Sequence, residues 1–305
     1  MEQHLYEIES EMERLIEGRF TAAPLLRHAR MFMSEKRKEE IYFGYLTVLH
    51  YRMFGGTGDI VYKAAAAVEL FILASDILDD IQDQDAESKA WMKVPMPLAL
   101  NTASAMITLS QQALTECGGD PRTRTLLGDM MNRQLLQAAN GQMLDLANDI
   151  SDEEAYIEMI KQKSASLVVF ACMAGVILAG RDWHPVVAEY AMEVGISAQI
   201  RNDLKDLLRW DDKSDFIHRK KTLLTLYLLE EVAEQDRWIA DYFEGRISFE
   251  DIRDKRELLE EACERSGTLL YGAVMSRLHY NKFEELLDSL PESKVWKAEF
   301  IQFVS

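Results

Sequence analysis

The sequence predicts an all-α protein, a single helical domain over residues 1–305. Apolar residues recur at helical spacing through most of the chain, and no stretch of useful length alternates apolar and polar residues as a half-buried strand does. Only six prolines and fifteen glycines interrupt the 305 residues, which suits long helices. Because no linker and no internal repeat divides the chain, one domain is favoured over the two that its length allows.

The N-terminal third is expected to lead into a central helix. Residues 3–17 and 35–54 look amphipathic and are joined through Pro24, and an FGGTGD turn ends the second of them. A helix over 60–83 follows. Its AAAAVELFILAS stretch is apolar nearly all round, as a helix surrounded by others is.

The middle of the chain predicts three more long helices. A polar loop over 84–95 precedes a helix at 97–116, and CGGDP separates this helix from the next one at 122–148. The sequence SDEEAYIEMI then indicates a capped helix start, with Ser151 as the N-cap and Glu154 three residues later.

The C-terminal half continues the helical pattern. The helix that starts after Ser151 is expected to run to Gly180, and a further one occupies 185–210, followed by a DDKSDF loop. The remaining helices are expected at 221–235, 236–244, 248–265 and 269–288.

The composition narrows the partners and the location. The formal net charge is −18, which makes free nucleic acid and anionic membranes unsuitable partners for the chain as a whole. Three scattered cysteines form no CxxC motif and fit a reducing cytosol. The longest apolar run, 167–180, is shorter than the roughly 20 residues of a bilayer span and is interpreted as a core helix. The acidic start is unlike a signal peptide, so a cytoplasmic location is expected.

Four aspartates gather on one face at the end of the central helix. Asp76, Asp79, Asp80 and Asp83 stand at i, i+3, i+4 and i+7. Aspartate is a poor helix former and like charges one turn apart repel, so this arrangement destabilises a helix without a bound cation. Carboxylate oxygens suit Mg²⁺, and Asp79 and Asp83 are spaced to hold metal ions. The alternative is a helix end that frays into an acidic loop.

A second polar cluster repeats this spacing over a hundred residues later. It consists of Gln199, Asn202, Asp203 and Asp206 and follows an apolar stretch. Asn202 and Asp206 are one turn apart and are the expected metal ligands. Two such helix ends at the mouth of a bundle would bind a metal-bridged anion. The alternative is an ordinary surface turn, NDLKD, with Lys205 in an ion pair.

Lysines that follow these clusters are candidates for binding the anion. Lys163 lies in IKQKSAS, and Lys220 and Lys221 lie in HRKKTLL. Lysine is a compact charge and a common phosphate ligand, although any one of these side chains is equally explained as a solvated surface residue.

These motifs resemble the trans-isoprenyl diphosphate synthase family. DDIQD (79–83) is similar to its first aspartate-rich motif, and GISAQIRNDLKD (195–206) is similar to its second, with Asn202 replacing an aspartate. GQMLDL (141–146), Lys163-Ser164-Ala165 and Lys221-Thr222-Leu223 resemble further elements of the family, in the same order. The similarity runs from about residue 40 to 230.

The resemblance implies a helical bundle around a deep central pocket, in which an allylic diphosphate ionises. Fixed cations stabilise the leaving diphosphate, and the apolar pocket keeps water from the carbocation. The implied cofactor is Mg²⁺, as three ions, with Asp79, Asp83, Asn202 and Asp206 as metal ligands. The implied catalytic residues are Asp79, Asp80, Asp83, Asn202, Asp203 and Asp206, and the implied diphosphate ligands are Lys163, Gln199 and Lys221.

Two anion-binding elements of the family are absent from this sequence. The family binds isopentenyl diphosphate with Gly-Lys-Arg-x-Arg-Pro, where this chain has EEIYFG (39–44). The family also has an Arg pair after its first motif, where this chain has DAESKAWMKVP (85–95). Acidic residues facing a second diphosphate would repel it.

This pattern is similar to a smaller branch, the prenyltransferases that modify the competence pheromone precursor of Bacillus-type bacteria. There the acceptor is the neutral, electron-rich indole of a tryptophan in a short peptide, which needs no phosphate-binding cations. Trp91 is a candidate residue at the acceptor entrance. Small residues before the first motif, Ala74 and Ser75, leave the prenyl pocket open, and Phe71 is a candidate for closing it lower down. A C15 donor is expected to fit, and a C10 donor stays open.

Four functions are therefore compared. The leading one is a Mg²⁺-dependent transfer of a geranyl or farnesyl group to a peptide tryptophan, in quorum sensing and competence. A synthase making geranyl, farnesyl or geranylgeranyl diphosphate and a terpene cyclase are the other enzymes. A noncatalytic helical partner subunit of a synthase is the alternative of another class. The resemblance also implies a homodimer, and the apolar donor leaves a peripheral membrane contact open.

Overall fold

The computed structural model describes residues 1–38, 42–84, 86–211 and 214–305. Within these ranges every regular element is helical, which confirms the all-α prediction. The described chain forms two compact units: residues 1–138, 166–192 and 284–305 make the first, and residues 139–165 and 193–283 make the second. A single domain over 1–305 stays a prediction.

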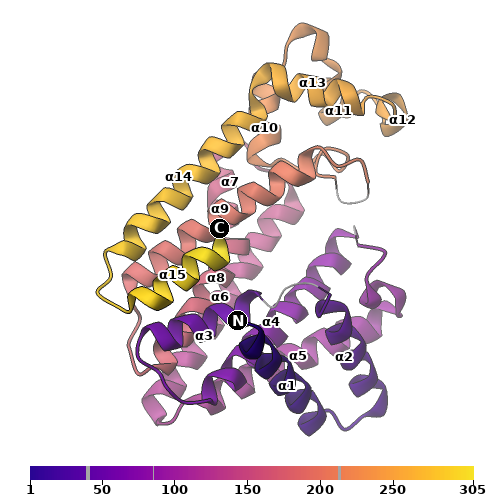
Figure 1. The fold of residues 1–305 in the computed structure, drawn as a ribbon. Helices are drawn as coiled ribbons and strands as arrows, with labels where there is room; N and C mark the ends of the chain where they lie inside the picture. Colours follow the sequence, from indigo (N-terminus) through magenta and orange to yellow (C-terminus); the bar gives the residue numbers. More distant parts are fainter. Residues whose placement is uncertain (39–41, 85, 212–213) are drawn as a thin grey trace. The chain divides into compact units, whose positions relative to one another are not determined.

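The first unit contains the N-terminal helices and the C-terminal one (Figure 1). Its elements are α1 (Glu2–Arg19), α2 (Ala23–Lys36), α3 (Tyr42–Met53), α4 (Ile60–Asp83), the 3₁₀ turn η1 (Ala90–Lys93), α5 (Met96–Cys117), α8 (Ser166–Leu178) and α15 (Lys294–Val304). The boundaries between the units fall inside α6 (Pro121–Ala147), α9 (Pro185–Leu207) and α14 (Thr268–Asp288).

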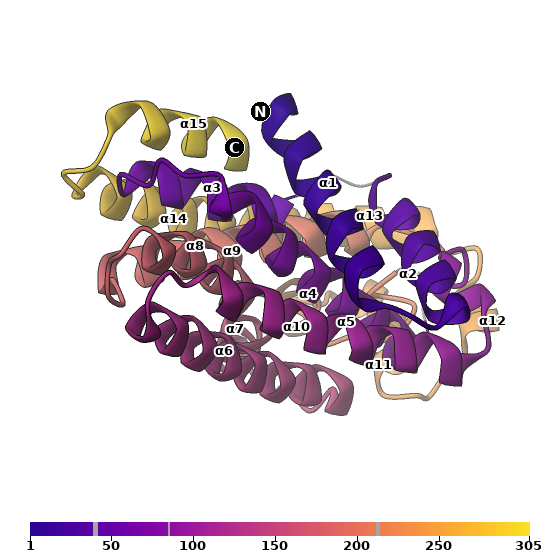
Figure 2. The ribbon, with the colours of Figure 1, turned by 90° about the horizontal axis from the view of Figure 1, so that it is seen from below.

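Helix α4 forms the centre of the first unit. All of its residues from Ala64 to Ala74 are buried, and it packs against α1, α3, α5 and α8. Figures 1 and 2 show α1 and α5 beside it. The four alanines 64–67 allow neighbouring helices to approach closely because they carry no bulky side chain. The expected central helix is confirmed, and its buried length gives the acidic residues at its end a rigid support.

Helix α8 packs tightly against α3 in the first unit. A Cβ atom added to Gly175 would lie 2.3 Å from the carbonyl oxygen of Thr47, so only glycine permits this approach. The Thr47 hydroxyl donates to the carbonyl of Ala171 at 2.9 Å. Residues 153–178 are long and apolar enough for a membrane span, but 72% of their most apolar window is buried, as in the core of a folded protein.

The second unit has its own apolar core. Its elements are α7 (Glu153–Ile160), a π-helical turn η2 (Lys161–Ala165), α10 (Leu223–Glu230), η3 (Glu234–Asp236), α11 (Trp238–Phe243), α12 (Phe249–Ile252) and α13 (Arg256–Ser266). Phe216, Leu224 and Tyr242 belong to the buried cluster that α10, α11 and α13 surround.

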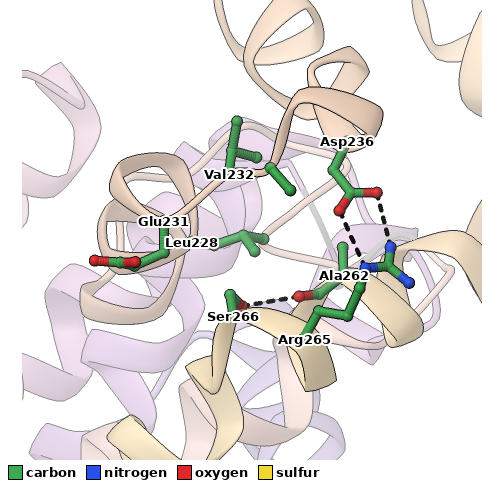
Figure 3. Close-up of a pocket in the computed structure, with 8 residues that line it drawn as sticks. Leu228, Glu231, Val232, Asp236, Ala262, Arg265 and Ser266 are labelled. Atoms are coloured by element: carbon green, nitrogen blue, oxygen red, sulfur yellow. Dashed lines mark hydrogen bonds and ion pairs between the residues drawn. The ribbon is translucent and has the colours of Figure 1, made fainter.

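A small cavity beside this core is shown in Figure 3. Its volume is about 120 Å³, and an ion pair between Arg265 and Asp236, 2.8 Å long, lies in its wall. Ligand pockets usually begin at about 300 Å³. The cavity is therefore a packing gap and not the prenyl pocket.

Several boundaries differ from those expected. Pro24 does not join two helices but lies in the first turn of α2, where its missing N–H costs nothing. Asp152, not Ser151, caps α7: its side chain accepts the N–H of Ala155 at 2.9 Å, while the Ser151 hydroxyl donates to the same carboxylate. The helix expected to run to Gly180 is divided by η2, and α15 had no counterpart in the predictions.

Candidate active site

The first acidic motif lies in the last two turns of α4. The helix continues through Asp83, so the alternative of a frayed end does not hold. It ends at Gln84, which adopts a left-handed conformation (φ 57°) and donates its N–H to the carbonyl of Asp80. Asp79, Asp80 and Asp83 are all partly exposed. Asp79 and Asp83 thus stand one turn apart on an ordered helix, as expected.

A lysine that the motif analysis did not single out lies beside this motif. Lys36, at the end of α2, binds Asp76 at 2.8 Å, and only 12% of its side chain is exposed. Its charge also acts on Glu69, whose Oε1 accepts the N–H of Gly44 at 2.5 Å. Burial raises the pKa of Glu69 to about 7, and Lys36 opposes that rise. Two carboxyl groups therefore share one cation here.

The expected prenyl-pocket residues lie earlier on α4. Phe71 and Ala74 are buried and Ser75 is half-buried. The Ser75 hydroxyl donates to the carbonyl of Phe71 at 3.1 Å, so its polar atom is satisfied by its own helix. The rings of Phe71 and of Phe170 in α8 pack edge to face, with their centroids 5.3 Å apart. A bulky aromatic pair therefore lies one turn below the small residues, and their role in pocket length stays a prediction.

The second motif separates into an inner and an outer pair. Asn202 is exposed and Asp206 is partly exposed, but Asp203 is only 3% exposed. The Asp203 carboxylate accepts hydrogen bonds from the Tyr156 hydroxyl and from the Gln199 amide, the latter at 2.9 Å. Asp203 and Gln199 therefore face the interior of the second unit. Gln199 and Asp203 have the same i, i+4 spacing as Asn202 and Asp206, so spacing alone does not tell which pair is buried.

Negative charge accumulates around this motif. Burial raises the pKa of Asp203 to about 6 and that of Asp215 to about 8, and repulsion from Asp206 and Asp145 adds to both shifts. Hydrogen bonds from Tyr156 and Gln199 lower the pKa of Asp203 in part. Carboxyl groups that raise one another's pKa are stabilised in their charged form by a cation.

Lys163 is held at the same place by an ion pair with Asp145 of α6. It lies on the π-helical turn η2, a distortion often found at functional sites. A Cβ atom added to Gly141 would lie 2.2 Å from the backbone nitrogen of Lys163, so α6 approaches this turn only because residue 141 is glycine. Lys220 reaches the same Asp145 oxygen at 4.0 Å.

Asn148 fixes the loop that carries the other lysines. Its Oδ1 accepts the N–H of Lys221 at 2.9 Å, and its Nδ2 donates to the carbonyl of Arg219 at 3.0 Å. Asn148 itself has a left-handed backbone (φ 48°), which asparagine tolerates better than most residues. Thr222 then caps α10. Asp145 belongs to the GQMLDL segment and Asn148 lies just after it, but the sequence does not show that their partners are Lys163 and the backbone at Lys221.

The donor set fits a divalent cation that arrives with a phosphate. Within the described ranges, no group of three or more His, Cys, Asp or Glu side chains could hold a metal ion alone. Magnesium in phosphate-handling sites is usually held by one or two carboxylates plus phosphate oxygens. Asp79 and Asp83 in the first unit are one pair with oxygens of this kind, and Asn202 and Asp206 in the second unit are another.

Comparisons with known proteins agree with these features. The polyprenyl synthetase family pattern matches residues 44–262. The chain is 33% identical to the tryptophan prenyltransferase ComQ of Bacillus subtilis subsp. natto over 84% of its length and 78% of that protein's. It is 28% identical to a short chain isoprenyl diphosphate synthase of Methanothermobacter thermautotrophicus, over 83% and 81% of the two chains. A crystal structure of a geranylgeranyl pyrophosphate synthase superposes with a TM-score of 0.87 at 22% identity, covering 99% of this chain and 95% of the other.

Proposed function

The chain belongs to the polyprenyl synthetase family and is a prenyltransferase, and we propose that it transfers the prenyl group of an allylic diphosphate to a tryptophan of a short peptide. The observation that carries the choice of acceptor is the 33% identity to a tryptophan prenyltransferase. It is supported by the residues at 39–44, which are acidic or neutral where a second diphosphate would need cations, and by the absence of an Arg pair from 85–95. Residues 39–41 and 85 lie outside the described residues.

The transfer breaks the C1–O bond of the donor, the C2=C3 π bond of the indole and one peptide N–H bond, and it forms two bonds. The C1–O bond of the donor breaks and the diphosphate leaves with the electron pair. Indole C3 then forms a bond to C1, a backbone nitrogen of the peptide closes a ring onto indole C2, and the N–H proton is released. Geranyl and farnesyl diphosphate are the proposed donors, and a pheromone precursor in competence signalling is the proposed source of the peptide.

The leaving diphosphate is the group that the charged residues would bind. Lys163 and Lys221 supply positive charge, and Asn148 and Asp145 hold these lysines in place. We propose that Asp79, Asp83, Asn202 and Asp206 hold Mg²⁺, in a set of three ions. When bound, these ions neutralise the charge that develops on the diphosphate. Asp203 acts from inside the unit, where its hydrogen bonds with Tyr156 and Gln199 fix the helix that carries Asn202 and Asp206.

The environment of Lys36 supports a site for one diphosphate rather than two. Lys36 lies close to the first motif, and the carboxyl groups of Asp76 and Glu69 already offset its positive charge. A second diphosphate would have to compete with both carboxyl groups for the ammonium group of Lys36. A neutral indole makes no such demand.

A short-chain isoprenyl diphosphate synthase is the second candidate function. It is favoured by the 28% identity to the archaeal synthase over most of both chains. It predicts chain elongation when isopentenyl diphosphate is supplied with an allylic diphosphate. The leading proposal predicts that elongation is absent and that the donor is consumed only when a tryptophan peptide is present.

Mass spectrometry of a peptide after incubation with the protein tests the proposal. The peptide carries one tryptophan, and a matched peptide carries phenylalanine instead. Geranyl and farnesyl diphosphate are supplied separately with Mg²⁺. We expect a mass increase of one prenyl group less one hydrogen on the tryptophan peptide only. A double variant, D79N with D83N, should abolish it, whereas D129N, an exposed aspartate of α6, should not.

The outcomes separate the candidate functions. Elongation of the donor in the presence of isopentenyl diphosphate, without peptide modification, would establish the synthase instead. A hydrocarbon released without any acceptor would establish a terpene cyclase. Unchanged behaviour of the D79N/D83N variant in every assay would favour the noncatalytic partner subunit.

We also propose that the protein works in the cytoplasm as a homodimer, with peripheral membrane contact when it receives its apolar donor. Light scattering after gel filtration tests the dimer. Sedimentation with vesicles, with and without farnesyl diphosphate, tests the membrane contact.

A further inference from the structure

The segment after the first acidic motif is folded back onto the first unit. Gln84 ends α4 with a left-handed backbone, Ala86 is fully buried, and the turn η1 packs against α2, α4 and α5. The sequence alone predicts a polar loop here. The difference arises from Trp91, a large apolar residue in the middle of a polar stretch, which is only 2% exposed.

Trp91 makes a hydrogen bond to the motif itself. Its indole Nε1 donates to Oδ2 of Asp80 at 2.7 Å. A buried indole N–H needs an acceptor, and here the acceptor is the middle aspartate of the acidic motif. The ring also meets the edge of Phe32 from α2 at 5.9 Å, and the ammonium group of Lys89 lies 5.4 Å from the ring. Residues of three elements thus fix the position of the indole.

We propose that Trp91 is a positioning residue for donor binding, acting through Asp80. This inference rests on the proposed function only in that the acidic motif binds the diphosphate of the donor. Asp80 lies one turn from both Asp76 and Asp83 on the same helix, so fixing its carboxylate limits the positions that these neighbouring carboxylates can take. An arrangement that is fixed in advance need not be ordered when the ligand binds.

The hydrogen-bond donor of Trp91, a neutral indole N–H, acts differently from an arginine at the same place. A guanidinium group would hold the carboxylate and also add a positive charge that attracts a further phosphate. An indole N–H holds the carboxylate without adding charge. Trp91 therefore orders the motif through a neutral hydrogen-bond donor, in keeping with a neutral acceptor.

The test compares two variants of this contact. Trp91→Phe keeps a buried aromatic ring and removes the N–H. Phe32→Leu, the matched control, disturbs the packing around Trp91 and leaves the hydrogen bond. Titration calorimetry with Mg²⁺ and farnesyl thiodiphosphate, which does not ionise readily, gives the dissociation constant, and thermal unfolding gives Tm. We expect Trp91→Phe to weaken binding of the thiodiphosphate about tenfold, because one hydrogen bond to a charged group is lost. The Mg²⁺ concentration required for binding should also rise. Phe32→Leu should lower Tm with less than about a twofold change in binding.

A double-variant cycle shows whether Trp91 acts through Asp80. In an Asp80→Ala background the Trp91→Phe change should have no further effect on binding, because the acceptor is already gone. Equal donor affinity of Trp91→Phe and the unmutated protein, or additive effects in the cycle, would overturn the proposal and leave Trp91 as a packing residue.

A second measurement needs no variant at position 91. In protein labelled with ¹⁵N-tryptophan, one of the five indole N–H signals should move both on addition of Mg²⁺ with the thiodiphosphate and in Phe32→Leu. If no signal responds to both, the proposal fails. Neither measurement uses a peptide, so a failure to prenylate tryptophan would reject the proposed acceptor and leave this inference standing.

Discussion

Glu69 gives a prediction whose size follows from the structure. Its side chain is fully buried in α4, and burial raises its pKa from 4.5 to about 7. A carboxyl group with a raised pKa binds more protons in the folded state than in the unfolded one between these two values. The stability it contributes is therefore complete below pH 4.5 and is lost as the pH rises through about 7.

The magnitude follows from the shift. Two and a half pKa units at 1.36 kcal/mol each give an upper bound of about 3.4 kcal/mol, and we expect about 2 to 3 kcal/mol. Glu69→Gln keeps an oxygen that can accept the Gly44 N–H and has no charge to bury. The free energy of unfolding of the variant, relative to that of the unmutated protein, should rise by that amount between pH 4 and pH 8.

Urea denaturation followed by circular dichroism at the two pH values measures this difference. Asp203 and Asp215 also have raised pKa values, so only the difference between variant and unmutated protein is informative. Glu285→Gln, at an exposed position of α14, is the control and should give no pH-dependent difference. A difference between Glu69→Gln and the unmutated protein that stays constant from pH 4 to pH 8 would refute the reasoning, because the buried carboxyl group would then titrate as it does in the unfolded chain.

Two further predictions concern the site. Gly141→Ala should displace the turn that carries Lys163, because the new methyl group would lie 2.2 Å from a backbone nitrogen. We expect this variant to lose about 1–3 kcal/mol of stability and to bind the thiodiphosphate more weakly. The control, Gly128→Ala, adds its methyl group in an open part of α6 and should bind normally. Ala74→Phe should narrow the prenyl pocket, so that the ratio of farnesyl to geranyl transfer in competition falls at least about tenfold, while an unchanged ratio would remove Ala74 from the pocket.

Comparison of the second motif with its surroundings shows how far sequence reasoning reaches. The spacing of Asn202 and Asp206 predicted that they share a face, and both are accessible. The same reasoning grouped Asp203 with them, although it is buried against Tyr156, a residue 47 positions away. Helical spacing gives the angle between side chains but not which angle points inward.

The lysines show the same division. The sequence predicts Lys163 and Lys221 as phosphate ligands from their charge and from the family resemblance. It did not identify Asp145 and Asn148, which hold them, because these contacts join α6 to elements further along the chain. Lys36 and Trp91 reach the first motif in a similar way, from α2 and from η1.

The amino-acid sequence by itself determined the helical fold, the central position of α4 and the order of the acidic motifs, because periodicity and local charge are properties of neighbouring residues. Tertiary structure decided which carboxylates are buried, which are paired and which lysines they hold. Those outcomes depend on contacts between residues far apart in the chain, and on the cost of burying a charge that only such contacts can offset.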